Sequence, residues 1–205
     1  MPRSTPANAV FLNVPFDAAY RPIFEALVFC VIDCGFEPRC ALEASDGGHV
    51  RVEKIARIIA DCAFGVHDIS RTELDKKSRL PRFNMPFELG LFLGAKRFGD
   101  RRQKRKSTLI LDRERYRYQK YLSDIAGQDI KAHDHKPTQL IGAVRDWLRD
   151  ADANRHLPSC TVIVGRYQKF RHDLPGLCRN LRLDPDELTY NDYKWVIGRW
   201  LEKNG

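Results

Sequence analysis

Glu88 is the one acid in an otherwise apolar stretch, PRFNMPFELGLFLG, residues 81–94. If this stretch is a helix, the positions on the same face as Glu88 are Leu91, Phe92 and Ala95. None of these side chains can pair with a carboxylate. A carboxylate held in apolar surroundings can stabilise positive charge that develops on a substrate, because its charge is weakly screened there. Glu88 is therefore the first candidate for chemistry.

A second interpretation of Glu88 needs no function. If Pro86 were the first helical residue, Glu88 would be the third, where a carboxylate meets the positive end of the helix dipole. A capping box would place Ser or Thr three residues before Glu88, and the sequence has Met85 there. Both interpretations stay open at this point.

Apolar runs and helix-spaced apolar residues alternate along most of the chain. This alternation predicts an α/β fold, with a parallel five-stranded sheet and helices on both faces. The expected strands lie at 9–16, 36–42, 62–70, 107–112 and 128–133, and the expected helices at 18–33, 50–61, 85–97, 115–126 and 138–150.

Polar residues are expected to gather where these strands end. In an open parallel sheet, ligands bind beyond the carboxyl ends of the strands, near the point where the strand order reverses. No Gly-x-Gly-x-x-Gly follows the first strand, and no Gly-Lys-Ser loop or nucleophile elbow occurs, which argues against dehydrogenases, NTPases and serine hydrolases. The polar residues at the strand ends are Asn13, Glu43, Asp68, Ser70 and Asp112.

The stretch PRFNMPFELGLFLGAKRFG resembles the Arg-x-Asn-Val-x-x-Glu-Leu-Gly-x-Phe-x-Gly signature of bacterial TIR-like nucleotide-binding domains. A strand that ends in HDIS shortly before the glutamate is also similar, and more loosely resembles the nucleoside deoxyribosyltransferases. The resemblance covers roughly residues 9–150, with Met85 in place of the usual valine. The matching residues are Arg82, Asn84, Glu88, Gly90, Phe92 and Gly94.

The resemblance implies a flavodoxin-like fold and a hydrolase that cleaves the bond between nicotinamide and ribose in NAD, with Glu88 as the catalytic carboxylate. It also implies a role in antiphage defence and activation by assembly, through a homo-oligomer or a separate activator protein. NAD would be the substrate, and no cofactor is expected. The substrate-binding residues on this hypothesis are Asn13, Phe16, Asp68, Ser70, Arg82 and Asn84.

Each of these assignments has an alternative. Asp68 and Ser70 could form only a turn or a helix cap, and Phe16 could belong to the core. The protein could also be a nucleotide-binding or signalling module that does not cleave, a deoxyribosyltransferase-like N-glycosidase, or an adaptor for nucleic acid or protein.

The alternation of strands and helices stops near residue 154. Beyond it, 160–167 is a short β-prone run and 188–205 reads as an amphipathic helix that carries Trp195 and Trp200. About fifty residues bury little surface on their own. The sequence therefore predicts a TIR-like domain at 1–153 and, at 154–205, a small, mainly helical appendage that packs on the core or on another subunit.

The net charge of +8 comes in large part from KRFGDRRQKRK, residues 96–106. This basic loop is either a solvated surface or a contact for an acidic partner or nucleic acid, and it lacks the interleaved aromatic residues that stack on bases. The six cysteines form no CxxC pair and read as reduced core thiols. We expect no metal site, no membrane span and a cytoplasmic location.

Overall fold

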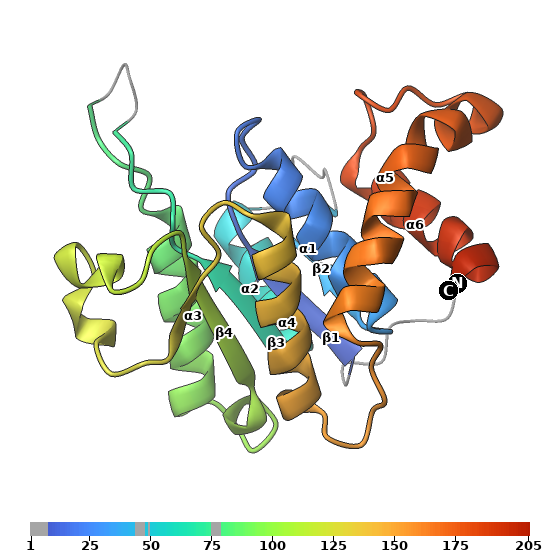
Figure 1. Ribbon diagram of the computed structural model, residues 1–205. Coiled ribbons are helices and arrows are strands. Elements are labelled where there is room, and N and C mark those ends of the chain that lie inside the picture. Colours follow the sequence, from blue (N-terminus) through green and yellow to red (C-terminus); the bar gives the residue numbers. More distant parts are fainter. Residues whose placement is uncertain (1–7, 44–47, 49, 75–78) are drawn as a thin grey trace.

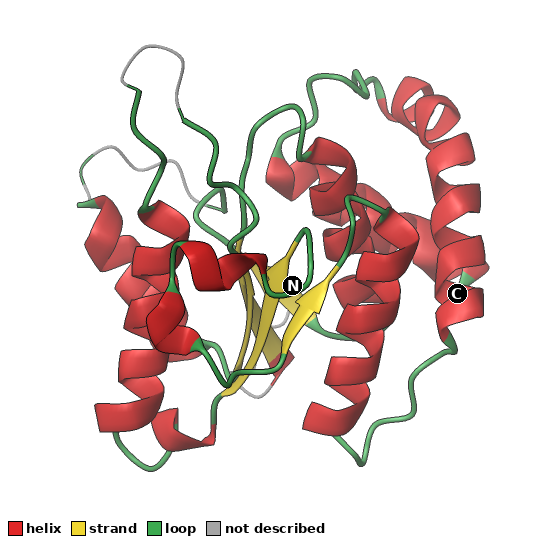
Figure 2. Cartoon of the chain, turned by 60° about the vertical axis from the view of Figure 1, so that its left-hand side comes forward, coloured by secondary structure: helices red, strands yellow, loops and turns green. Residues whose placement is uncertain are grey.

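The computed structural model describes residues 8–43, 48, 50–74 and 79–205. Five parallel strands form one sheet in the order β2-β1-β3-β4-β5, with helices on both sides (Figures 1 and 2). This is the strand order of flavodoxin-like folds, so the predicted fold class is confirmed. The strands are β1 (Ala9–Asn13), β2 (Glu37–Arg39), β3 (Phe64–Asp68), β4 (Ser107–Asp112) and β5 (Ile130–Ala132).

The helices divide between the two faces of the sheet. Alternate residues of a strand point to opposite faces, and in β1 Val10 and Leu12 join one apolar cluster while Phe11 joins the other. The first cluster lies under α1, α4, α5 and α6, and the second lies under α2 and α3. The helices are α1 (Arg21–Asp33), α2 (Arg51–Asp61), α3 (Asn84–Phe98), α4 (Pro137–Ala151), α5 (Cys160–Leu181) and α6 (Tyr190–Asn204).

The predicted β-prone run at 160–167 is wrong, because these residues begin helix α5. The hydroxyl of Ser159 caps the helix by accepting a hydrogen bond from the backbone N–H of Val162. Further along, Ile163, Tyr167 and Phe170 recur at helical spacing and are buried. Packing of this apolar face outweighs the preference of the β-branched residues for strands.

A second correction concerns residues 115–126, which were expected to form one helix. They form two short 3₁₀ turns, η3 (Arg117–Lys120) and η4 (Ser123–Ile125). Tyr116, just before the first turn, has a left-handed backbone with φ of 60°. This conformation cannot continue into a regular α-helix, and the segment instead packs Tyr118 and Ile125 into a small apolar cluster with Ile69.

Helices α5 and α6 pack against α1 and share its apolar core (Figure 1). The ring of Phe29 on α1 lies 5.2 Å from that of Phe170 and 6.0 Å from that of Trp200, between ring centroids. Two ion pairs join α1 to α5: Glu25 with Arg171, and Asp33 with Arg166 at 3.0 Å. The predicted packing of the C-terminal segment on the core is thus confirmed, whereas a domain boundary at residue 153 stays a prediction.

Other sequence predictions concern features spread over the chain. None of the six cysteines, all of which the structure describes, forms a disulfide, and all but Cys160 are buried. Over the described ranges, no helix is long and apolar enough to cross a membrane, and no three His, Cys, Asp or Glu side chains gather as metal ligands would. The polar and glycine-rich stretch EASDGGH, residues 43–49, predicts a loop after β2, and most of it lies outside the described residues.

Candidate functional site

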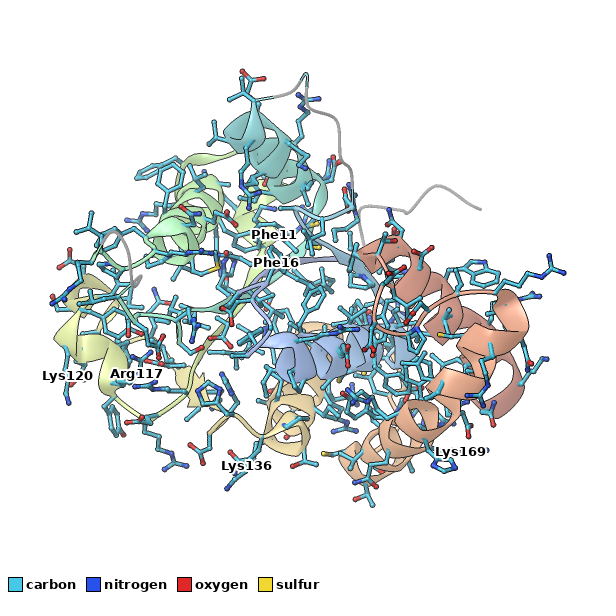
Figure 3. The ribbon with its side chains drawn as sticks, turned by 90° about the horizontal axis from the view of Figure 1, so that it is seen from above. Phe11, Phe16, Arg117, Lys120, Lys136 and Lys169 are labelled. Atoms are coloured by element: carbon cyan, nitrogen blue, oxygen red, sulfur yellow. The ribbon has the colours of Figure 1, made fainter. Side chains whose placement is uncertain are left out.

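The candidate site lies beyond the carboxyl ends of β1 and β3, where the strand order reverses. β1 pairs with β2 on one side and with β3 on the other, which makes this edge the expected ligand crevice. Asn13, Asp68 and Asp112 are the last residues of β1, β3 and β4, as the sequence predicted. Figure 3 shows the molecule from above, looking onto this edge, with Phe16 near its centre.

Glu88 is 5% exposed and lies on α3. The helix begins at Asn84, so Glu88 is its fifth residue, and the first turn contains no acid. The interpretation of Glu88 as a first-turn helix acid is therefore wrong. No hydrogen bond or ion pair to its carboxylate occurs among the residues that the structure describes.

The pKa of Glu88 reflects these surroundings. Burial raises it from 4.5 to about 6, and Arg51, the first residue of α2, offsets only part of this rise. The carboxylate is thus ionised for the most part at neutral pH, although its environment opposes the charge. A carboxyl group whose pKa is raised by burial at the ligand edge of a sheet is a candidate functional residue.

Asn13 fixes the start of α3 against the end of β1. Its side-chain Nδ2 donates to the carbonyl oxygen of Met85 at 2.8 Å and lies 3.0 Å from Nδ1 of His67. Both amide protons are thereby used, so Nδ1 of His67 accepts and the proton of this ring lies on Nε2. Burial, followed by the charge of Lys106, lowers the pKa of His67 to about 3, which keeps the ring neutral. Asn13 therefore positions the helix that carries Glu88.

Gly65 on β3 allows α3 to approach the sheet closely. A Cβ at this position would lie 2.6 Å from the ring of Phe92, which is closer than real contacts allow. Phe92 is on the same face of α3 as Glu88, one turn further on. Its close packing on β3 fixes the distance between α3 and the sheet, and therefore the position of the Glu88 carboxylate at the edge of the sheet.

Asp68 is completely buried and is the centre of a hydrogen-bond network. Its carboxylate accepts from the Tyr20 hydroxyl and, at 2.8 Å, from the backbone N–H of Ser70, and it lies 2.9 Å from Nε2 of His133. Nδ1 of His133 accepts from the N–H of His135, which leaves the proton on Nε2 facing Asp68. Burial alone would raise the pKa of Asp68, but these neighbours lower it. The bond from the Ser70 N–H shows that Asp68 makes a local contact of the kind the alternative interpretation expected, and contact with a substrate stays a prediction.

Asp112 is held by a residue that sequence reasoning missed. Arg117 donates to Oδ1 of Asp112 from both Nε, at 2.9 Å, and Nη2, at 2.6 Å. The same guanidinium reaches the carbonyl oxygen of Ser70 at 2.7 Å and the hydroxyl of Thr72 at 2.6 Å. Arg117 therefore ties the end of β4 to the segment after β3, and Asp112 serves this structural contact.

The other predicted residues lie nearer the surface. Glu43 is bound by the guanidinium of Arg39 at 2.6 and 2.7 Å, so its charge is already paired. Phe16 is 37% exposed and packs edge-on against Phe24, which contradicts a core position. Arg82 and Asn84 are exposed where the chain enters α3. The structure thus brings Asn13, Asp68 and Glu88 to one edge. The Asp68 carboxylate is bonded there, whereas the carboxylate of Glu88 has no hydrogen bond or ion pair within the part of the chain that the structure describes.

Comparisons with family models, curated proteins and solved structures found no match for this chain.

Proposed function

We propose that this protein is an N-glycosidase that cleaves the bond between nicotinamide and ribose in NAD. The observation that carries the proposal is Glu88, a buried carboxylate at the ligand-binding edge of the sheet without a partner among the described residues. The resemblance of residues 81–94 to the signature of TIR-like domains supports the choice of NAD as substrate. The two other carboxylates at the strand ends, Asp68 and Asp112, are already bonded.

The proposed reaction needs a negative charge close to the ribose. When the bond between C1′ and the nicotinamide nitrogen breaks, its electron pair leaves with the neutral nicotinamide, and positive charge develops on the ribose. A carboxylate beside the ring stabilises this oxocarbenium-like state, most strongly where water is largely excluded. Water then adds its oxygen to C1′ and releases a proton. Ionised Glu88 meets the requirement.

The experiment that tests the proposal is incubation of the full chain with NAD, with detection of nicotinamide and ADP-ribose. We expect equal amounts of the two products. NADH, whose nicotinamide ring is neutral and a poorer leaving group, is the matched control and should be cleaved far more slowly. Absence of products from NAD over a wide range of protein concentrations, with a macromolecular crowding agent included to favour assembly, would contradict cleavage by this chain alone or as a homo-oligomer.

Assembly is part of the proposal, as the resemblance implies. Phe83 and Phe87 flank the start of α3 and are 65% and 57% exposed. Large exposed aromatic side chains next to one another are typical of protein contact surfaces. A homo-oligomer or an activator protein that covers them would contact the helix that carries Glu88, and the resulting NAD depletion could serve antiphage defence.

The pKa of Glu88 predicts how its replacement changes stability with pH. Because its pKa is raised from 4.5 to about 6 in the folded protein, the ionised carboxylate opposes folding above pH 6. This cost decreases as the pH falls through 6 and is absent well below 4.5, where both states are protonated. We expect Glu88→Gln to be about 1 to 2 kcal/mol more stable than the wild type at pH 7.

Urea unfolding at pH 7 and pH 4.5 measures this difference. The gain in unfolding free energy should be present at pH 7 and should fall to a few tenths of a kcal/mol at pH 4.5, where the carboxyl group is about half ionised in the unfolded chain. Equal stability of the two proteins at both values, or a less stable variant at pH 7, would show that Glu88 has a favourable partner in the folded state.

A second function is favoured by a basic surface at the opposite edge of the sheet, formed by Lys96, Arg97, Arg101, Lys104 and Arg105. Among the described residues, no carboxylate lies within ion-pair distance of these five, and three of them line a hollow of about 640 Å³. Lys106, in contrast, is buried: its Nζ donates to the carbonyl oxygens of Ile59, at 2.6 Å, and Cys62. We propose that the basic surface binds a polyanion such as nucleic acid, independently of Glu88.

Replacing Lys96, Arg97, Arg101 and Lys104 by Ser should strongly weaken this binding. For a short DNA duplex, the logarithm of the binding constant should fall steeply with the logarithm of the salt concentration, and the slope should be smaller by about 3.6 for the variant than for the wild type. A variant with the same charge, changed to Ser at four other exposed positions, is the control: Arg115, Lys120, Lys136 and Lys203. Equal binding by the two variants would exclude the basic surface as the contact.

A further inference from the structure

A cavity of about 290 Å³ opens between the β1–α1 loop and the beginning of α6. One wall comes from Phe16, Ala18 and Phe24, and the facing wall comes from Leu188, Tyr190 and Tyr193. The C-terminal helices therefore do more than cover α1. They complete a cavity at the same edge of the sheet as Glu88, and its volume is at the lower end for small-molecule sites.

The walls of this cavity are mainly aromatic. The rings of Phe16 and Phe24 meet edge-on at 5.4 Å, and Phe24 lies 6.0 Å from Tyr190. The hydroxyl of Tyr190 donates to the carbonyl oxygen of Pro38 at 2.6 Å, and that of Tyr193 donates to the carbonyl oxygen of Glu25. Because these hydroxyl groups are bonded to the protein, the tyrosines offer the cavity their apolar rings. Such walls suit a flat aromatic ring.

The charged residues around the cavity are already paired. Arg21 binds Glu25 at 2.8 Å and the carbonyl oxygen of Pro185 at 2.9 Å, and Asp17 binds Arg71 at 3.1 Å. The cavity is therefore suited to an uncharged ring.

The cavity and Glu88 flank the same strand end. Asn13 is the last residue of β1, and the chain reaches Phe16 at the cavity three residues later. On the other side, the Asn13 side chain binds Met85, three residues before Glu88. The two parts of this edge differ in charge. The carboxylate of Glu88 has no ion pair with any residue that the structure describes, whereas the cavity has an aromatic lining whose charged residues are paired.

From this difference we infer that the cavity binds the neutral adenine base of the dinucleotide, while the cationic nicotinamide end lies at Glu88. This inference rests on the proposed function for the identity of the ligand. It assigns helix α6 a role in substrate binding, through Tyr190 and Tyr193. The base is held by contact with aromatic rings.

The test fills the cavity without disturbing the core. Ala18 and Ala19 are both exposed neighbours in the β1–α1 loop, but only Ala18 lines the cavity. Ala18→Trp should weaken the binding of AMP, measured by calorimetry on the full chain, about 5- to 100-fold. Ala19→Trp, the matched control, should bind AMP like the wild type. Nicotinamide mononucleotide should bind equally to both variants and to the wild type.

The outcomes separate this inference from the proposed function. Loss of AMP binding in Ala18→Trp alone supports the base site, even if the wild type never releases nicotinamide from NAD, in which case only the glycosidase proposal fails. Conversely, if NAD is cleaved but AMP does not bind the wild type, or binds both variants equally, the base site is overturned. A weakened binding of nicotinamide mononucleotide in Ala18→Trp alone would also overturn it, because the cavity would then hold the other end of the dinucleotide.

Discussion

Glu88→Gln is expected to lower the rate of nicotinamide release from NAD at least about a hundredfold, with little change in substrate binding. Glutamine keeps the size of the side chain and removes the charge that stabilises the oxocarbenium-like state. The loss of such a transition-state interaction typically costs about 3 to 4 kcal/mol. Nicotinamide release and NAD binding should be measured together on both proteins.

Two controls make this result interpretable. Glu53→Gln is the same change on an exposed turn of α2, and it should leave cleavage intact. Melting curves must show that Glu88→Gln is folded, and the pKa of Glu88 predicts that it is more stable than the wild type at pH 7. A well-folded Glu88→Gln protein that cleaves NAD at the wild-type rate would remove the main reason to regard the protein as an enzyme.

Phe170→Ala is expected to lower the free energy of unfolding by about 3 to 5 kcal/mol, as is usual for a fully buried phenylalanine. Phe170 lies on α5 and is completely buried. Its ring joins α1 and α6, because the ring centroid lies 5.2 to 5.8 Å from those of its aromatic neighbours Phe29, Trp200 and Tyr193. Urea unfolding measures the loss.

Phe98→Ala is the matched control for this change. Phe98 is 85% exposed at the end of α3, so its replacement should change the unfolding free energy by less than about 0.5 kcal/mol. If Phe170→Ala cost less than about 1 kcal/mol, the C-terminal helices would not be packed on α1 as described, and a cavity wall built from α6 would lose its support.

Much of the fold could be predicted because apolar periodicity reports burial directly. β1 and β3 are buried along their whole length, and β1 is a continuous apolar run up to its last residue, Asn13. Apolar periodicity predicted the wrong element where the local preference of the residues and their packing in the fold disagree. Residues 160–167 carry β-branched side chains, yet they form a helix because Ile163 and Tyr167 pack on the core. The helix predicted at 115–126 does not form for a local reason, because the left-handed backbone of Tyr116 interrupts it.

The candidate site could be predicted only in part, because sequence patterns locate strand ends but not the partners across them. Asn13, Asp68 and Asp112 were placed at the correct edge for this reason. Arg117 was missed, since its contacts with Asp112 and Ser70 depend on a 3₁₀ turn. The contact of His133 with Asp68 was missed as well, because nothing in the sequence pairs these two residues.

These missed partners change how the acids at this edge are interpreted. Asp68 and Asp112 each accept several hydrogen bonds from the protein. They hold the strand ends together, and a substrate would have to displace those contacts to reach them. Glu88 has no such contacts among the described residues, and this difference singles it out as the candidate for catalysis.

The most direct test of this account is the pH dependence of kcat/KM for nicotinamide release by the wild type between pH 5 and 8. Because the ionised form of Glu88 is the active one and its pKa is about 6, the rate should be constant above pH 7. It should decrease about tenfold for each pH unit below 6. A residual rate of Glu88→Gln, if measurable, should not show this decrease. A wild-type rate that stays constant down to pH 5, in a protein that remains folded there, would contradict the assignment of Glu88 as the catalytic carboxylate.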